Sequence, residues 1–138
     1  MRYDDRLLTV LNQPAGDRHD AAVRWRQLVD LVARAGPNGA GPTVVRAIEE
    51  IRRESANVDD SLRAAAARGI AALPLPLALL ESFAADKLAV CAPILAAATL
   101  DSGQWQALFS IADSETRRFI LTLHPDVRPE VQAGLDPV

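Results

Sequence analysis

Apolar residues recur at helical spacing along most of the chain. Trp25, Leu28, Val29 and Val32 follow the i, i+3, i+4, i+7 pattern, which places them on one side of a helix. Two later stretches repeat this spacing: Val44, Ile48 and Ile51, and then Trp105, Leu108, Phe109 and Ala112. No segment alternates apolar and polar residues as a half-buried strand does. The pattern therefore predicts an all-α chain.

Breaks in the pattern predict about nine short helices. Residues 35–42, AGPNGAGP, hold three glycines and two prolines and therefore form a loop, and LPLP at 73–76 ends another helix. Pro42 suits the first turn of the following helix, where its missing N–H costs nothing. Asp101 followed by Gln104 indicates a capping box. The expected helices cover 4–12, 17–35, 43–56, 60–72, 76–84, 87–98, 102–112, 114–123 and 127–134.

Three consecutive stretches share one plan, in which an aspartate precedes an apolar helix, a turn and a second helix. The stretches are 59–86, 86–113 and 113–137. Asp60 and Asp86 lie 26 positions apart, and Asp86 and Asp113 lie 27 apart, where aspartates suit helix N-caps. Stacked pairs of short helices are the plan of an α-solenoid. Pro93 lies inside one expected helix and predicts a kink there.

The length suits a single helical domain spanning 1–138. We expect residues 1–58 to form N-terminal capping helices, because terminal units of a stack need a polar outer face. Residues 59–137 then form about three helix-pair repeats. Aromatic residues make up only 4% of the chain, so the core consists mostly of small aliphatic side chains that let helices approach closely.

Charge and composition argue against several function classes. The net charge is −3 and the pI is about 5.3, whereas non-specific nucleic-acid binding needs clustered Lys and Arg. No apolar run approaches the ~20 residues that span a bilayer, and the N-terminal segment lacks the long apolar stretch of a signal peptide. Cys91 is the sole cysteine, so no internal disulfide forms. These features predict a cytoplasmic chain without membrane insertion.

The segment LTLHPDV contains the His-Pro-Asp tripeptide with which J-domain cochaperones stimulate their ATPase partner. A J-domain needs a long basic helix before the tripeptide and a lysine-bearing loop after it. Here only Arg117 and Arg118 are basic in the preceding helix, and VRPEV follows. We therefore favour a helix junction, in which His124 ends one helix, Pro125 stops it and Asp126 caps the next.

No motif indicates catalysis, a cofactor or a metal. The chain contains neither a G-x-S-x-G elbow nor a phosphate-binding loop. Cys91 has no nearby His in sequence and lies on an apolar stripe, so a small buried core residue is the favoured interpretation. Glu49 and Glu50 lie three or four positions before Arg52 and Arg53, which predicts surface ion pairs. We expect no enzyme activity from this chain.

Five residues are candidates for contact with a partner. Trp25 and Trp105 are candidates because Trp is enriched at binding hot spots, although both lie on apolar stripes where a core position is favoured. The others are Arg46, Arg52 and Arg53, in the charged segment RAIEEIRRES. A solvated surface is the expected role of that segment, and a partner-binding face is the alternative.

The later part of the chain, FAADKLAVCAPILAAATLDSGQWQALFSIADSETRRFILTLHPDVRPEVQAGL, resembles the alphaproteobacterial HEAT-like repeat domain of uncharacterised function. The similar features are FAAD before a helix, the proline in VCAPIL, the TLD turn before an aromatic-bearing helix, and the closing short helix. Upstream, YDDRLLTVLNQPAGDRHDAAVRWRQLVDLVAR resembles the opening of sphingomonad sensor histidine kinases that have this module at their N-terminus. The resemblance covers most of the chain and is weakest over 36–58.

This resemblance implies a HEAT-like helical repeat stack and a non-enzymatic regulatory or protein-interaction module of a cytosolic sensor histidine kinase. In such kinases a PAS domain and a catalytic core follow, whereas this chain contains no phospho-acceptor histidine box and no glycine-rich ATP lid. Because these kinases work as dimers, the implied partner is another protein or a second copy in a homodimer. The alternative is a small-molecule-sensing input domain with a pocket between repeats.

Overall fold

The computed structural model describes residues 3–13, 16–39 and 41–127, which form eight α-helices, one short 3-10 helix and no strand. The predicted all-α class is confirmed over these residues. The elements are α1 (Tyr3–Leu11), α2 (Arg18–Ala33), α3 (Pro42–Glu54), η1 (Ser55–Asn57), α4 (Asp60–Ile70), α5 (Leu77–Ala84), α6 (Leu88–Ala97), α7 (Ser102–Ile111) and α8 (Ser114–Leu123). The boundaries of these eight helices lie within two residues of those predicted. The ninth predicted helix, 127–134, lies outside the described residues except for Val127.

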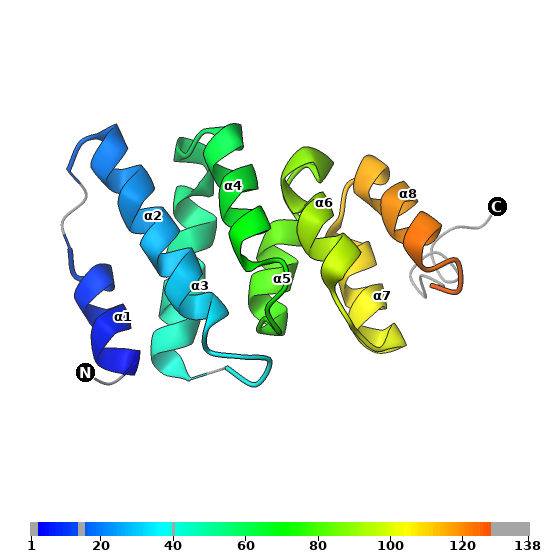
Figure 1. Cartoon of the computed structure of the whole chain (residues 1–138), viewed down its shortest axis with the longest axis horizontal. Helices are drawn as coiled ribbons and strands as arrows, with labels where there is room; N and C mark the ends of the chain where they lie inside the picture. The colour runs from blue at the N-terminus through cyan, green and yellow to red at the C-terminus, as the bar shows by residue number, and fades with distance from the viewer. Residues whose placement is uncertain (1–2, 14–15, 40, 128–138) are drawn as a thin grey trace.

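The helices form two rows along the length of the molecule (Figure 1). One row holds α2, α4, α6 and α8 side by side, and the other holds α1, α3, α5 and α7. Helices also pack between the rows, as α1 does on α2 and α7 does on α8. The main contacts therefore join elements that are one or two places apart in the chain, and α1 and α8 lie at opposite ends of the stack.

Several local signals act as the sequence predicts. Pro42 is the first residue of α3. The Asp101 carboxylate accepts the backbone N–H of Gln104 at 2.8 Å, and the Gln104 side chain accepts that of Asp101 at 3.0 Å, so the capping box is present. Pro93 lies inside α6, as expected, and the kink that it predicts stays a prediction. His124 follows the last residue of α8 and donates its backbone N–H to Ile120 at 2.8 Å, which agrees with a helix end.

The prediction that three repeat aspartates cap helices is right for one of them. Asp113 precedes α8 and accepts the backbone N–H of Thr116 at 2.8 Å, which lowers the pKa of its carboxyl group. Asp60 is instead the first residue inside α4, and Asp86 lies one residue before the cap position of α6. The carboxylates of Asp60 and Asp86 instead accept hydrogen bonds from the buried Arg63 guanidinium.

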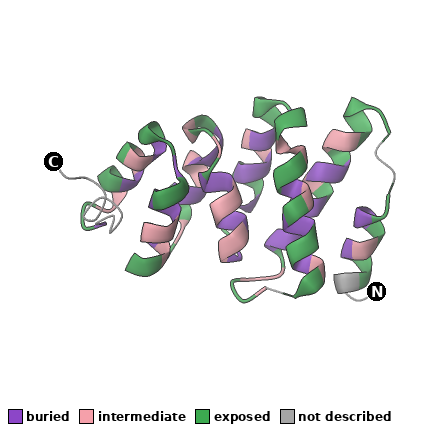
Figure 2. Cartoon of the chain, turned by 180° about the vertical axis from the view of Figure 1, so that it is seen from behind, coloured by how far each residue is buried: buried purple, intermediate pink, exposed green. Residues whose placement is uncertain are grey.

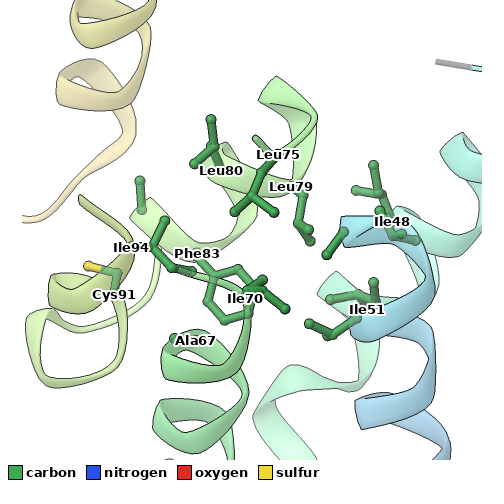
Figure 3. Packing of buried hydrophobic residues seen from close by; sticks show 14 of the residues in the cluster. Ile48, Ile51, Ala67, Ile70, Leu75, Leu79, Leu80, Phe83, Cys91 and Ile94 are labelled. Carbon is green, nitrogen blue, oxygen red and sulfur yellow. The ribbon is translucent and has the colours of Figure 1, made fainter. Parts of the chain in front are cut away.

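The core lies between the two rows and continues along the stack. Figure 2 shows buried segments where helices face their neighbours and exposed segments at the turns. In Figure 3, Phe83 and Ile70 lie at the centre of the labelled cluster, with Ile94 of α6 on one side and Ile51 of α3 on the other. Cys91 is fully buried, as predicted. The small aliphatic residues thus hold successive helices together.

Candidate functional site

The buried side chain of Arg63 in α4 connects three parts of the chain through hydrogen bonds. We call this set of contacts the Arg63 joint. The Arg63 guanidinium has five N–H donors. Two are accepted by the backbone carbonyl groups of Ser55 and Val58, one by Asp60 at 2.8 Å, and two by Asp86 at 2.7 and 3.1 Å. The Asp86 carboxylate raises the pKa of Arg63, so the charge persists although the side chain is buried. Arg63 therefore has no donor left for a ligand.

Arg24 of α2 makes a similar joint to the end of α1. Its guanidinium donates to the carbonyl groups of Val10 at 3.2 Å and Leu11 at 2.9 Å, and to Glu50 of α3 at 3.2 Å. These carbonyl groups belong to the last turn of α1, where no N–H of the same helix is available to them, and that of Val10 also accepts the backbone N–H of Gln13 at 3.1 Å. Arg24 thus ties α1, α2 and α3 together.

Side chains at one equivalent helix position make similar contacts in α4, α6 and α8. Arg63, Cys91 and Arg117 are each the fourth residue of their helices, and they are separated by 28 and 26 positions. Arg117 donates to the carbonyl groups of Phe109 at 2.9 Å and Ser110 at 3.0 Å, at the end of α7. Cys91 places its weak S–H donor 3.9 Å from the carbonyl of the residue two positions after α5. Side chains at this position therefore contact the end of the preceding helix in each of these pairs.

Next to the Arg63 joint is an open groove of about 680 Å³, which contains one of the predicted interaction residues. Its lining includes Arg52, Ser55, Glu81, Ser82, Ala85 and Ile111, and we call it the Arg52 groove. Arg52 reaches from α3 to α5, where its Nε donates to the Ser82 hydroxyl at 2.7 Å and its Nη2 to the Ala78 carbonyl at 3.3 Å. These partners are neutral, so they fix the guanidinium without cancelling its charge.

The groove also presents a carboxylate that belongs to no ion pair among the described residues and an exposed aliphatic side chain. Neither Arg52 nor Glu81 belongs to the ion pairs formed among the described residues. Ile111, at the end of α7, is 42% exposed although it is aliphatic. The groove therefore combines a positioned cation, an available carboxylate and an exposed apolar contact.

The other predicted arginines lie outside this groove. Arg46, near the start of α3, donates to the Asn12 side chain at 3.4 Å. Arg53 forms an ion pair with Glu50, as predicted, while Glu49 forms none of its predicted pairs within the described part of the chain. The structure therefore does not bring the three predicted arginines to one site.

Both predicted tryptophans belong to the core, as the favoured interpretation states. Trp25 is 2% exposed and donates its indole N–H to the Ile51 carbonyl at 3.0 Å. Trp105 is 3% exposed, and its indole N–H has no hydrogen-bond partner among the described residues. Its ring lies 4.2 Å from the His124 ring, centroid to centroid, at an angle of 36°. Neither indole lines the Arg52 groove.

A second hollow, which we call the aliphatic cleft, lies at the opposite end of α4 and α5. It has a volume of about 360 Å³. Its walls include Leu75, Leu77, Leu80, Ile94 and Leu100. These residues come from two consecutive helix pairs, so the cleft lies at a boundary between pairs.

The sequence patterns did not single out Arg63, Ser82 or Ile111. Arg63 had a signal, since DSLRAAAARGI and SETRRFILTL place an arginine at the same helix position. Ser82 and Ile111 had none, because their contribution depends on α5 and α7 ending beside α3. Position in the stack, and not residue type, brings these side chains together.

A metal-binding cluster and a membrane-spanning helix are both absent from the described residues. No group of three or more His, Cys, Asp or Glu side chains there is arranged to hold a metal ion. In the same part of the chain, no helix has both the length and the apolar character that crossing a bilayer requires. Comparison with protein-family models, curated proteins and solved structures finds no match to this chain.

Proposed function

We propose that this chain is a HEAT-like helical repeat module that binds proteins and regulates a cytoplasmic sensor histidine kinase. The main support is the joint at the fourth position of α4, α6 and α8, which recurs with nearly the spacing of the sequence repeat. Stacked helix pairs of this kind expose long surfaces suited to protein contact. The resemblance of the sequence to the N-terminal region of such kinases supports the regulatory role.

A non-enzymatic role fits the use of the buried polar side chains. Arg24 and Arg63 bind helix ends and carboxylates within the chain, so their donors are committed to holding the stack. The Cys91 thiol is buried, and desolvation raises its pKa to about 11, which disfavours the nucleophilic thiolate. These side chains thus serve packing rather than chemistry.

The Arg52 groove is the contact surface that fits this function best. Its guanidinium is already positioned by Ser82, so binding a carboxylate costs little side-chain entropy. Ile111 supplies an apolar contact beside it. A two-fold pair of chains would place Arg52 of one copy against Glu81 of the other and the reverse, because such an interface uses the same surface twice. We propose that the groove mediates this homodimer.

A charge-exchange experiment tests the dimer. Light scattering across a hundredfold concentration range measures the dimer dissociation constant of the wild type, Arg52→Glu, Glu81→Arg and the double variant. Each single variant is expected to weaken the dimer at least tenfold because like charges then meet, and the double variant is expected to restore most of the affinity. Arg46→Glu changes the same charge outside the groove and is expected to leave the dimer unchanged.

A monomer at every concentration contradicts self-association. Equal losses for Arg46→Glu and Arg52→Glu would show that net charge and not the groove controls assembly. In either case a pull-down with the dimerisation and catalytic regions of a sensor histidine kinase still tests the regulatory role. Failure of both experiments removes the proposed function.

A further inference from the structure

We infer that the aliphatic cleft binds a small neutral molecule with an aliphatic chain and one hydrogen-bonding head group, such as a primary amide or an alcohol. The cleft lies at the ends of α4 and α5 that are remote from the Arg52 groove. It is therefore a separate site, and the inference does not rest on protein binding at that groove.

The base of the cleft is made of core residues. Leu75, Leu80 and Ile94 line it and are 6%, 3% and 1% exposed. Figure 3 shows these three side chains toward one side of the labelled cluster, away from Ile51. Because these side chains pack within the core, the base of the cleft is fixed before a ligand arrives, and little reorganisation is needed on binding.

The size of the cleft selects the class of occupant. Its volume of about 360 Å³ is near the lower end of the roughly 300–1,000 Å³ typical of small-molecule sites. Half-buried Leu77 and Leu100 provide further aliphatic wall. A short unbranched chain fits within such a space, whereas a helix or strand of another protein does not.

The lining of the cleft is uncharged, which favours a ligand with a neutral head group. None of the residues that line the cleft has an ionisable side chain. A carboxylate or an ammonium group would lose hydration there without gaining a counter-ion, which costs several kcal/mol in general. A neutral ligand avoids this cost.

Polar groups at the cleft provide both donors and acceptors. The Gln104 carbonyl oxygen is taken by the capping box, and its amide NH2 group and the Thr99 hydroxyl form no hydrogen bond with another described residue. Ala71, Ala97 and Ala98 line the cleft at the ends of α4 and α6, where the last carbonyl groups of a helix have no intrahelical donor. A head group that accepts from Gln104 and donates to such a carbonyl matches both, as an amide or an alcohol does.

Titration of the wild-type chain with primary n-alkyl amides from butanamide to decanamide tests the inference. Backbone amide chemical shifts in NMR spectra report both affinity and location. Each added CH2 group is expected to tighten binding about fourfold until the chain fills the cleft, after which the gain stops. Hexanoate and hexylamine are expected to bind at least tenfold more weakly than hexanamide. The largest shift changes are expected at Leu75, Ile94 and Leu100.

Two neighbouring alanines provide matched variants. Ala96 and Ala97 are both exposed on the last turn of α6, but only Ala97 lines the cleft. Ala97→Leu places a larger side chain in the cleft and is expected to weaken hexanamide binding at least tenfold, whereas Ala96→Leu is expected to change it less than twofold. Circular dichroism confirms that each variant is folded.

Four results overturn the inference. Three of them are shift changes that avoid the cleft residues, equal binding by Ala96→Leu and Ala97→Leu, and tighter binding of hexanoate or hexylamine than of hexanamide. The wild-type shift map decides the outcome even if Ala97→Leu does not fold. Absence of any shift change at saturating hexanamide also overturns it.

Discussion

Trp25 and Trp105 are both buried, but only Trp25 has a hydrogen-bond partner for its indole N–H among the described residues. Replacing Trp25 with Phe removes a donor from the Ile51 carbonyl and from the Ser55 hydroxyl, which accepts at 3.3 Å. Replacing Trp105 with Phe removes a donor that is already unsatisfied, whose burial costs about 1–3 kcal/mol. We expect Trp25→Phe to lower the free energy of unfolding by about 1–2 kcal/mol more than Trp105→Phe does.

Urea unfolding monitored by circular dichroism measures this difference. Each single variant retains one tryptophan, so fluorescence provides a second probe and tests two-state behaviour. Equal losses of stability, or a larger loss for Trp105→Phe, would contradict the interpretation that the Trp105 indole N–H is left unsatisfied.

We expect the buried Cys91 thiol to make the folded chain less stable at alkaline pH. Burial raises the pKa of its thiol from 9.0 to about 11, so the folded chain keeps a proton that the unfolded chain releases above pH 9. The stabilisation is fully present below pH 9 and is lost as pH rises through about 11. Wild type is therefore expected to lose on the order of 1 kcal/mol more than Cys91→Ala across this interval.

Unfolding by urea at pH 8, 9, 10 and 11 measures the difference between these two chains. Other groups titrate in both chains and cancel in the comparison. A thiol reagent gives an independent measurement, because Cys91 is expected to react at the rate at which the chain opens and not at the rate of an exposed cysteine. Parallel stability curves for wild type and Cys91→Ala would show that the thiol is not desolvated.

At the residue scale, the sequence predicts which side chains are buried better than it predicts their polar partners. Trp25 and Cys91 lie on apolar stripes, and both are buried. The pairing of Arg63 with Asp60 is a local i,i+3 contact within α4, whereas its pairing with Asp86 requires that α4 and α6 lie side by side, which helical spacing alone does not specify. Long-range polar pairing thus depends on packing that the local pattern does not encode.

At the scale of elements, Arg63 and Arg117 occupy the same helix position but differ in burial. Arg63 is 7% exposed and satisfies all five donors, whereas Arg117 is half-buried and binds two carbonyl groups. Lysine cannot reproduce the planar fork of a guanidinium. We expect Arg63→Lys to lower the free energy of unfolding by about 3 kcal/mol and Arg117→Lys by about 1 kcal/mol.

Chemical denaturation of both variants provides the measurement, and Arg118→Lys is the control because Arg118 is exposed on the same helix as Arg117. A loss for Arg63→Lys no greater than that for Arg118→Lys would mean that the joint adds little to stability. Asp86→Asn offers a second test, since it leaves the Arg63 charge without its closest carboxylate and is expected to destabilise the chain.

Helix boundaries were predictable because their signals are local. Pro42, Asp101 and Asp113 each act within one turn of the helix they begin, and all three predictions are confirmed. The predicted caps of α4 and α6 are each wrong by one residue, since DD offers two adjacent aspartates and α6 begins one residue later than expected, with Lys87 at its cap position. The hydrogen bonds that Arg63 makes determine which aspartate belongs to the Arg63 joint.

On the scale of the whole molecule, the two rows explain why the sites were harder to predict than the helices. The Arg52 groove combines side chains from α3, η1, α4, α5 and α7, and the aliphatic cleft combines the ends of α4 through α7. The repeat spacing predicts that helix pairs succeed one another. It does not predict which turns face each other across the stack, and both sites depend on those turns.

The stacked arrangement also predicts how the molecule opens. Helices in the middle of the stack, such as α4, have neighbours on both sides, whereas the main contacts of α1 are with α2 and α3. Arg24 provides the polar link between α1 and these helices, through the carbonyl groups of Val10 and Leu11 and the Glu50 carboxylate. We therefore expect amide hydrogen exchange to be slowest in α4–α6 and faster toward α1.

The variant Arg24→Met tests whether loss of the Arg24 contacts destabilises α1 alone or all the described helices together. The variant keeps much of the apolar volume but leaves two carbonyl groups and the Glu50 carboxylate without the guanidinium. Exchange measured by mass spectrometry is expected to accelerate at least tenfold in α1 while α6 keeps its wild-type protection. Equal acceleration in α1 and α6 would mean that the described helices open as one cooperative unit, which would contradict nearest-neighbour stacking as the source of stability. Selective acceleration would show that terminal helices are held by their own joints, because the loss of one joint then leaves the rest of the stack closed.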